Sequence, residues 1–487
     1  MSVNNTNFME TVVSNEPLKK EVGIQVRPVK ATCGHSSRFI VLIQSACLIA
    51  IITSNTVVWN PSVIAITDLQ SSPKYNPNIT DDVDYYNDFS LPLADRRLIY
   101  SPMEKSYLFA AVFIGAIFGI LPIDLMLRCF GGYRTTILMS VLSTIGSSLV
   151  PFAVSHNFVL LIVLRLILGA TLSLAFPLIG TVISSWSAAT ESSIFVSVLT
   201  GYLQLCAIFS MTITGFFSAK VGWPSVFYIH SGAMVLLLAF WAYFYRDDIF
   251  RHRFVSEVEI RKISVGKEIN KVLKKETIPY RKIVASRPIQ VVWIAAGGNY
   301  LAAQFALTFW PSYLVRSLGY SLESAGFLAV IPLSLQFLAK LVAGFIGDRL
   351  HCLSDLRKIK LMNTIAFFGS AVFFVLAAAI PAEEYATMNL VFIICAIIIL
   401  GFNAGGFPKA GLMCSKQFSR FVMSTIQLIL CVTLCVGSFV VPLLTPNSTS
   451  DEYNVVFYIY AAALLVSNIV FVMFASAEPQ PFTEQSS

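Results

Sequence analysis

Charged residues are scarce in this sequence. Asp, Glu, Lys and Arg make up only 13% of its 487 residues, whereas 56% are hydrophobic; an ordinary soluble protein carries about 25% charged residues. This composition excludes a soluble enzyme, and no arrangement of a nucleophile with a base points to other catalysis. We therefore expect that the protein is not an enzyme.

Metal-ligand and disulfide patterns are also missing. The nine cysteines and five histidines show no ligand spacing, and most of the cysteines lie inside apolar stretches. We expect no metal site, no disulfide framework and no bound cofactor. A coupling ion such as sodium or a proton is compatible with this expectation.

Long apolar stretches are what the sequence does contain. Each of twelve stretches is long enough to cross a ~30 Å hydrocarbon core at a rise of ~1.5 Å per residue. A β-barrel would show short segments of alternating polarity, so continuous apolar runs predict an all-α membrane protein with twelve transmembrane helices. The stretches cover residues 39–66, 104–127, 136–155, 158–183, 194–217, 224–245, 289–313, 324–347, 361–381, 389–413, 421–444 and 454–475.

The longest polar segment between stretches, 246–288, divides them into six and six. This predicts two six-helix halves, 39–245 and 289–475, joined by a linker. Most of the 34 lysines and arginines lie on the side of the linker and the chain ends, and positively charged loops stay in the cytosol. We therefore expect the tails 1–38 and 476–487 in the cytosol together with the linker.

Two glycosylation sequons agree with this topology. Asn78, in the external loop 67–103, and Asn447, after the eleventh stretch, both lie outside under the assignment. Membrane topology also explains the basic loops, so we expect a lipid bilayer around the chain and no nucleic-acid partner.

Two related motifs stand at equivalent positions of the halves. GILPIDLMLRCFGGYR at 119–134 follows the second stretch, and GFIGDRL at 344–350 follows the eighth. With the six-plus-six layout, they resemble the major facilitator superfamily. RLILGATLSLAFP at 165–177, GWPSVFY at 222–228 and FASAEPQPF at 474–482 are similar to the solute carrier 17 family, which includes sodium/phosphate cotransporters, vesicular glutamate transporters and the lysosomal sialic acid carrier.

This resemblance implies a secondary transporter that works by alternating access in the plasma membrane or a lysosomal or vesicular membrane; we expect a monomer. The family's substrate residues are only partly kept. Its acidic residue in span four becomes Leu172, its span-two histidine becomes Phe109, and its carboxylate-binding arginines in spans one and seven align with Val58 and Asn299. The resemblance therefore supports the transporter class but gives little support to glutamate as the substrate.

Three basic residues lie inside the apolar stretches: Arg165, Lys340 and Lys409. A charge at mid-bilayer costs roughly 2.5–3.5 kcal/mol on insertion scales and usually faces a cavity or a partner. All carboxylates can be placed in loops, tails or stretch ends, so the interior is cationic, which favours a water-filled cavity that accepts an anion. The alternatives are that Lys409 extends to the membrane interface and that Arg165 ties helices through backbone carbonyls.

Neutral polar residues could complete such a site. Gln336 lies one turn before Lys340 on the same helix face, Asn60 ends a polar face of the first stretch, and the seventh stretch offers several more. These side chains hydrogen-bond either a solute or only neighbouring helices. The candidate substrate-binding residues are Arg165, Lys340, Asn299, Gln304, Asn60, Tyr300 and Gln336, with Gln204 and Gln427 as weaker candidates.

The charged residues of the two motif loops are candidate gating residues, which we expect to form charge contacts that hold the cytosolic side closed. They are Asp124, Arg128 and Arg134 in one loop and Asp348 and Arg349 in the other. In the linker, residues 256–275 form either an amphipathic helix on the inner leaflet or a solvated connection.

The sequence as a whole favours a secondary transporter for a small organic anion, or for phosphate, whose halves rock about a central site. The rival hypotheses are a neutral-solute carrier, in which the cations only tie helices, and a non-transporting sensor or scaffold. A proton-driven cycle needs a titratable group in the path. Because no carboxylate or histidine is placed mid-span, facilitated or potential-driven movement is expected unless Asp68, Glu104 or Asp124 reaches the cavity.

Overall fold

The computed structural model describes residues 36–483 apart from 68–84, 87–89, 265–277, 311–312, 319–321, 351, 382–383 and 447–448. Within these residues, every regular element is helical. Ten segments are long and apolar enough to span a membrane, and two of them, Met103–His156 and Ala386–Leu444, have 54 and 59 residues. Each of these two is long enough to cross twice at ~1.5 Å per residue, which brings the crossings to twelve.

The N-terminal half provides the first six crossings. Its helices are α2 (Ser37–Val57), α3 (Trp59–Thr67), α4 (Pro102–His156), α5 (Phe158–Leu172), α6 (Ala175–Trp186), α7 (Ser192–Thr200), α8 (Tyr202–Lys220) and α9 (Trp223–Phe244), with a 3-10 turn η2 (Ala189–Glu191) before α7.

The C-terminal half provides the other six. Its helices are α13 (Arg287–Gln304), the π-helical segments η4 (Phe305–Phe309) and η5 (Tyr313–Ser317), α15 (Leu322–Arg349), α16 (Asp355–Ala379), α17 (Ala386–Ile399), the 3-10 segment η6 (Leu400–Gly405), α18 (Phe407–Ser415), α19 (Ser419–Leu444) and α20 (Ser450–Phe474). Between and after the halves lie α10 (Glu257–Ser264), α12 (Tyr280–Ala285) and η8 (Pro481–Thr483).

Glycine explains the break inside α4. Gly131 has φ 81°, which L-residues rarely adopt, so the helix breaks there into two crossings. The Asp247 carboxylate, just after α9, accepts a hydrogen bond from the backbone N–H of Tyr133 at 3.0 Å. A Cβ on Gly132 would lie only 2.9 Å from that carboxylate. The glycine pair therefore leaves room for an acidic cap on the second half of α4.

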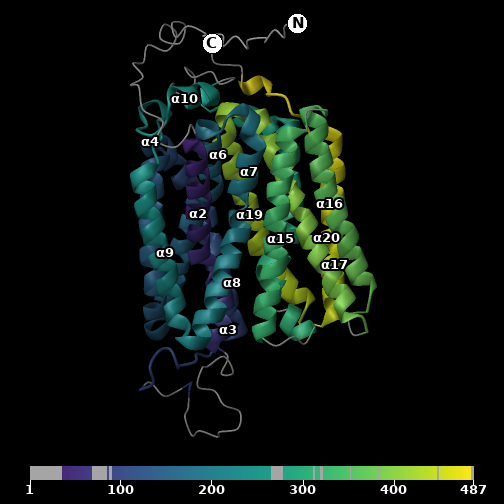
Figure 1. Cartoon of the computed structure of the whole chain (residues 1–487). Helices are drawn as coiled ribbons and strands as arrows, with labels where there is room; N and C mark the ends of the chain where they lie inside the picture. Colours follow the sequence, from purple (N-terminus) through teal and green to yellow (C-terminus); the bar gives the residue numbers. More distant parts are fainter. Residues whose placement is uncertain are drawn as a thin grey trace, which may run out of the picture.

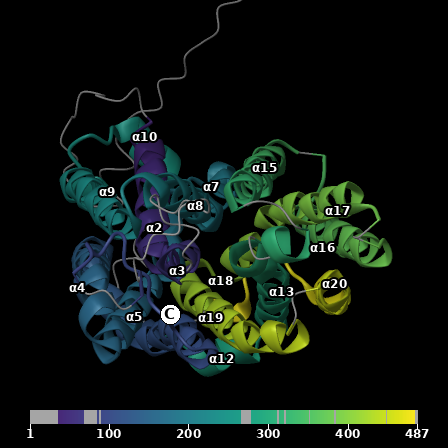
Figure 2. The same cartoon turned by 90° about the horizontal axis from the view of Figure 1, so that it is seen from below.

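The two halves stand side by side. Figure 1 shows α2, α4, α8 and α9 on one side and α15, α16, α17 and α20 on the other, and the view along the bundle in Figure 2 separates them in the same way. α15 packs against α7 and α8, and α19 packs against α4 and α6, so these helices form the contact between halves. Helices α10 and α12, η8 and the start of α2 lie at one end of the bundle, which we call the linker end.

The outer faces of the bundle are apolar. Leu121 on α4, Leu236 on α9 and Leu443 on α19 are each more than 70% exposed, and such side chains suit contact with lipid tails. Helix α16 begins at Asp355, before the apolar stretch that starts at residue 361, and its first turn contains an ion pair between Asp355 and Lys358.

Candidate functional site

A small cavity lies between the halves at the level of Lys340. Lys340 and Gln336 reach it from α15, Asn299 and Tyr300 from α13, and Gln204 from α8. The Lys340 ammonium donates to the backbone carbonyl of Thr200, on the opposite half, at 3.0 Å. The structure thus brings together four of the seven main candidate residues and one weaker candidate, Gln204. We call this space the lysine cavity.

Amide side chains make up most of the polar wall of the lysine cavity. Gln204 donates to the Oε1 of Gln336 at 2.7 Å across the two halves, and Asn403 donates to the Oδ1 of Asn299. All four side chains are at least 94% buried. Asn403 was not expected; it lies in η6, where Gly401, Gly405 and Gly406 interrupt the tenth crossing, and an interrupted transmembrane helix is the signal that could have found it.

A second cavity lies next to the first and contains Arg165, so we call it the arginine cavity. Leu203 and Leu307 line both spaces. The guanidinium donates to the carbonyl oxygens of Thr56 at 2.7 Å and Leu108 at 3.2 Å, and it lies 5.4 Å from the ring centre of Trp59. Arg165 therefore both ties helices α5, α2 and α4 and lines a cavity.

Two other candidates have different surroundings. Asn60, half-buried, lines the arginine cavity together with Thr53 and Thr56. Gln304 is fully buried and donates to the carbonyl of Leu434 at 3.0 Å, so it ties α13 to α19 and lines neither cavity. Gln427 likewise accepts from the backbone N–H of Phe176 at 3.4 Å and joins α19 to α6.

Both cavities are small. The lysine cavity has about 20 Å³ and the arginine cavity about 40 Å³, which is room for one to a few water molecules. A solute larger than water can enter only when the helices around the cavities move apart. The structure therefore shows the central path in a contracted state.

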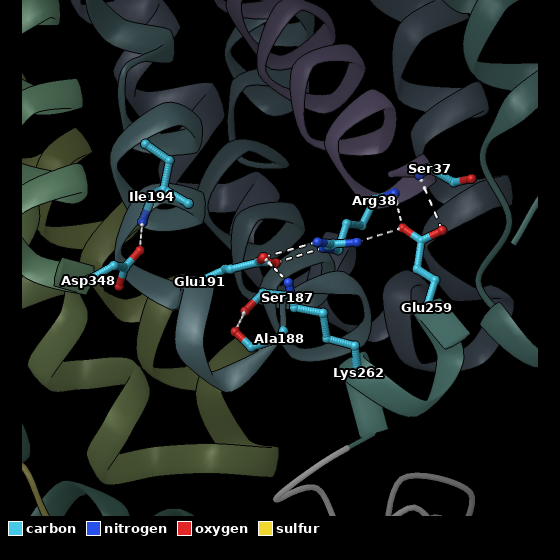
Figure 3. A network of polar contacts seen from close by, with 9 residues as sticks. All are labelled: Ser37, Arg38, Ser187, Ala188, Glu191, Ile194, Glu259, Lys262 and Asp348. Atoms are coloured by element: carbon cyan, nitrogen blue, oxygen red, sulfur yellow. Dashed lines mark hydrogen bonds and ion pairs between the residues drawn. The ribbon is translucent and has the colours of Figure 1, made fainter. Parts of the chain in front are cut away.

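At the linker end, a side chain of the C-terminal half caps the start of a helix in the N-terminal half. The Asp348 carboxylate at the end of α15 accepts hydrogen bonds from the backbone N–H groups of Ser193 and Ile194, at 3.0 and 2.9 Å, in the first turn of α7. Figure 3 shows the contact with Ile194. A carboxylate is stabilised there by the N–H groups and by the helix dipole. Asp348 thus holds this end closed through charge-assisted bonds to backbone groups of the other half, and among the described residues it forms no ion pair with an arginine.

Close packing supports the same contact. A Cβ on Gly344 would lie 2.4 Å from the Oγ of Ser197, so only glycine lets α15 approach α7 this closely. Lys409 of α18 donates to the hydroxyl of Ser193, and Arg420 of α19 donates to Thr181 of α6 at 3.3 Å. Lys409 therefore crosses between the halves and does not extend to a membrane interface. The hydrogen bonds described between the halves lie from the level of the cavities to the linker end.

The other motif loop forms fewer contacts than expected. Asp124 and Arg128 do form an ion pair, and Arg128 also donates to the hydroxyl of Tyr280 on α12 at 2.5 Å. Arg134 is exposed, and Arg349 lies over the Phe345 ring of its own helix at 4.1 Å. These two arginines were expected in charge contacts that hold the gate, and within the described residues neither forms an ion pair.

A second charged cluster, which we call the latch, lies beside the Asp348 contact (Figure 3). Arg38, at the start of α2, binds Glu191 through two hydrogen bonds of 2.7 and 3.0 Å. Glu259 of α10 accepts from the backbone N–H of Arg38 at 2.8 Å and from its guanidinium at 3.1 Å. Lys262 of α10 also binds Glu191 at 2.6 Å. The latch thus joins the first helix, the linker and the turn that leads into α7.

The latch lowers the pKa of Glu191 and holds a helix of the linker in place. Desolvation raises the pKa of Glu191, but the hydrogen bonds and charges of Arg38 and Lys262 outweigh it, so the net pKa is below the ordinary value of 4.5. Of the linker segment 256–275, the described residues form the helix α10, which is held by the fully buried Glu259 side chain, and residues 265–275 lie outside the described part of the chain. Ile263 is buried and Val258 exposed, whereas the apolar residues 269, 272 and 273 lie outside the described residues.

Comparison with known proteins gives the family. Residues 45–416, which are more than half of the chain, match the Major Facilitator Superfamily. The chain belongs to the Major Facilitator Superfamily. It is therefore a multi-pass membrane transporter and not an enzyme, and the predicted twelve-helix, all-α fold is confirmed.

Relatives of this superfamily member confirm the resemblance to the solute carrier 17 family. The uncharacterized transporter slc-17.2 of Caenorhabditis elegans is 29% identical over 73% of this chain and 74% of its own length. Sialin of Homo sapiens is 25% identical over 68% and 67% of the two chains. A putative inorganic phosphate cotransporter of Drosophila melanogaster is 23% identical over 82% and 77%.

Solved structures of the superfamily share the fold. The proton:xylose symporter XylE bound to 6-bromo-6-deoxy-D-glucose matches with a TM-score of 0.68 at 15% identity, over 92% of this chain and 99% of the other. A partially occluded inward-open form of the xylose transporter from E. coli gives a TM-score of 0.63 at 13% identity, over 90% and 99%. At this identity the likeness concerns the fold alone.

Three of the four positions at which this superfamily member departs from the solute carrier 17 pattern line a cavity. Phe109 and Leu172, in place of a histidine and an acidic residue, line the arginine cavity, and Asn299 lines the lysine cavity. Val58 is buried and lines neither. Within the described residues, Arg165 binds two backbone carbonyls and lies beside the Trp59 ring.

One buried histidine was missed by the sequence reasoning. His230 lies inside α9 with no exposed surface, so the statement that no histidine lies mid-span is wrong. Its Nδ1 is 2.8 Å from the carbonyl oxygen of Val226, and its Nε2 is 3.4 Å from the hydroxyl of Ser210, which contacts Ser54 at 2.6 Å. It lines neither cavity; its place within an apolar stretch was the available signal.

The remaining candidates are at or beyond the ends of the membrane helices. Glu104 forms a capping box with Ser101 at the start of α4, and Asp124 is paired with Arg128, so neither lines a cavity. Asp68 and the sequon residues Asn78 and Asn447 lie outside the described residues. In the part of the chain that the structure describes, no group of three His, Cys, Asp or Glu could hold a metal ion.

Proposed function

We propose that this transporter moves a small organic anion, or phosphate, by alternating access, with the lysine cavity as its binding site. The observation that carries the proposal is the position of Lys340. Its ammonium lies between the halves, has one neutral carbonyl as its described hydrogen-bond partner, and is 4% exposed. A buried ammonium without a carboxylate is stabilised when an anion enters.

Further features support an anionic solute. Arg165 adds a second positive charge one cavity away, and no carboxylate is among the residues that line either space. One relative is named for inorganic phosphate. Two cations and no carboxylate among the described residues that line these two adjacent cavities favour anions by Coulomb attraction and disfavour cations.

The closed linker end supports the transport cycle. Asp348, Gly344 and Lys409 hold the halves together there, so release on that side requires these contacts to separate while the halves rock. Because Lys340 bonds to Thr200 of the other half, an anion that competes for its ammonium loosens a bond between the halves. Binding and rocking are thereby linked.

Uptake into proteoliposomes tests this function. The wild type should accumulate radiolabelled phosphate or organic anions, and Lys340→Gln should reduce this uptake at least tenfold, because a charge-assisted bond is worth about 1.5–3 kcal/mol. Lys220→Gln, which removes an exposed lysine at the end of α8, is the matched control and should leave uptake unchanged. Undiminished anion uptake by Lys340→Gln would contradict the proposed site. Flux of a neutral solute that persists in Lys340→Gln would favour a neutral-solute carrier, and no flux of any solute in the wild type would favour a sensor or scaffold.

We propose facilitated or potential-driven movement without tight proton coupling. The described cavity walls carry no carboxylate and no histidine, and His230 is separated from both cavities. An imposed membrane potential should therefore drive uptake without a pH gradient. Uptake that stops when only the pH gradient, or only sodium, is removed would contradict this and identify the coupling ion.

The distribution of basic residues suggests how the protein is oriented in the membrane. We propose a monomer whose linker end and both termini face the cytosol, in the plasma membrane or a lysosomal or vesicular membrane, with glycans at Asn78 and Asn447. A shift in electrophoretic mobility on glycosidase treatment that disappears in the double variant Asn78→Gln, Asn447→Gln tests this. Glycosylation at Asn4 of the N-terminal tail would reverse the topology.

A further inference from the structure

The polar wall of the lysine cavity has both hydrogen-bond donors and hydrogen-bond acceptors to spare. Each primary amide carries one carbonyl oxygen and one NH2 group. In the pair of Gln204 with Gln336, one oxygen and one NH2 are used, which leaves the Oε1 of Gln204 without a partner and the NH2 of Gln336 without an acceptor. The pair of Asn403 with Asn299 leaves one oxygen and one NH2 in the same way.

This count does not depend on how the amides are turned. If both amides of a pair rotate by 180°, donor and acceptor exchange places, and the pair still leaves one oxygen and one NH2. Lys340 adds two further N–H groups, because only one is used on Thr200. Beyond these bonds, the residues that line the cavity therefore hold an ammonium with two free N–H groups, two NH2 groups and two carbonyl oxygens, which can bind a solute once the cavity widens.

A bare anion satisfies only part of this wall. Its oxygens accept from Lys340 and from the NH2 groups, but the amide oxygens beside them are left unpaired and repel the anion. Gln204 and Asn403 are only 5% and 6% exposed, and an unpaired buried acceptor is unfavourable. A hydroxyl group next to the anionic group donates to these oxygens and removes the penalty.

We infer that the preferred solute is a small hydroxycarboxylate: a carboxylate that binds Lys340, with a hydroxyl beside it that donates to the free oxygens of the amide pairs. This inference rests on the proposed function, because it assumes that an anion occupies the lysine cavity. A hydroxyl fits better than an ammonium donor, because an α-ammonium group is repelled by Lys340 and finds no carboxylate among the residues that line the cavity.

Direct binding tests the inference. Isothermal titration of the purified full-length protein compares lactate with propanoate, which share the carbon skeleton and the carboxylate and differ by the 2-hydroxyl; alanine serves as the ammonium-bearing analogue. Lactate should bind about tenfold more tightly than propanoate, the effect of one well-formed buried hydrogen bond. Alanine should bind more weakly than lactate.

Variants locate the effect. The double variant Gln204→Leu, Gln336→Leu removes one amide pair as a whole. The ratio of the propanoate Kd to the lactate Kd should fall, because one of the two free oxygens is lost, whereas propanoate should lose only the contribution of one NH2 donor; an unchanged ratio would contradict the inference. The control Asn389→Leu removes a buried amide of α17 that lines neither cavity and should keep the lactate preference. Melting temperatures confirm that each variant is folded.

The outcomes separate the two proposals. Equal binding of lactate and propanoate, both lost in Lys340→Gln, overturns the hydroxyl inference and leaves the anion site in place. Tighter binding of alanine than of lactate also overturns it. If neither anion nor inorganic phosphate binds to the wild type, the proposed function itself fails, and the inference fails with it.

Discussion

The carboxylate of Asp348, on the C-terminal half, accepts a hydrogen bond from the backbone N–H of Ser193, on the N-terminal half, at 3.0 Å. The residue before α7, Glu191, provides no side-chain cap, because its carboxylate is bound by Arg38 and Lys262. The first turn of α7 is therefore capped from the other half. The start of α7 thus connects the latch, through Glu191, with the contact between the halves, through Asp348.

Removing the charge of Asp348 should weaken the closed linker end. Asp348→Asn replaces a charge-assisted cap by a neutral one, which costs about 1–2 kcal/mol at a helix N-terminus. Hydrogen exchange of the peptide that covers the first turn of α7 should become roughly 5- to 30-fold faster. Asp355→Asn, in the same loop, is the control and should leave this peptide unchanged; equal protection in both variants would contradict the cap.

A side chain at Gly344 should force the halves apart. In Gly344→Ala the new Cβ would lie 2.4 Å from the Oγ and 2.8 Å from the Cβ of Ser197, so α15 and α7 have to separate. We expect faster hydrogen exchange at the linker end and slower transport. Gly215→Ala places a methyl group where no atom lies within 4 Å and should behave like the wild type. Normal transport by Gly344→Ala would show that the contact is not needed.

Neutralising Glu259 should destabilise the protein. Its carboxylate accepts from two backbone N–H groups, of Ser37 and Arg38, and from the Arg38 guanidinium. In Glu259→Gln one oxygen becomes an NH2 group that faces these donors, which should cost about 2 kcal/mol. Thermal unfolding in detergent measures this. The exposed Glu257→Gln on the same helix should unfold like the wild type, and an unchanged melting temperature for Glu259→Gln would contradict the latch.

The latch should survive mild acid. The folded pKa of Glu191 lies below 4.5, so its contribution to stability is fully present above about pH 4.5 and is lost as the pH falls through the lowered value. Stability measured between pH 7.5 and 5 should therefore show no loss that depends on Glu191. Below pH 4.5 the wild type should lose more stability than Glu191→Gln. If the wild type already lost more stability than Glu191→Gln near pH 6, the pKa of Glu191 would have to be raised instead of lowered.

Arg165 should have a structural role and an electrostatic role that can be separated. Arg165→Lys keeps the charge but loses the two-carbonyl contact with Thr56 and Leu108, so it should lower stability by about 1–2 kcal/mol and keep the preference for anions. Arg165→Gln should lose both. Uptake assays with matched anionic and neutral solutes, combined with melting temperatures, compare the two variants. Identical selectivity in both would leave Arg165 with the structural role alone.

The contacts of some gate residues were predicted from the sequence less well than the helices were. Arg134 shares a motif loop with Asp124, and Arg349 directly follows Asp348. Such proximity along the chain suggests ion pairs. In the fold, Asp348 faces the N–H groups of a distant helix start, while Arg349 turns to the ring of Phe345. Loop charges can choose among many partners, so spacing along the chain does not decide between them.

What the sequence determined by itself is the membrane architecture. Hydrocarbon contains no water to satisfy backbone groups, so long apolar stretches have to be helices whatever they later contact. The same reasoning identified Lys340 and Arg165, because a buried charge is costly wherever it lies. Only the tertiary structure decided that Gln204 meets Gln336, that Gln304 ties two helices away from the cavities, and that Glu259 holds Arg38. These contacts join residues more than a hundred positions apart, and only the packing of whole helices brings such residues together.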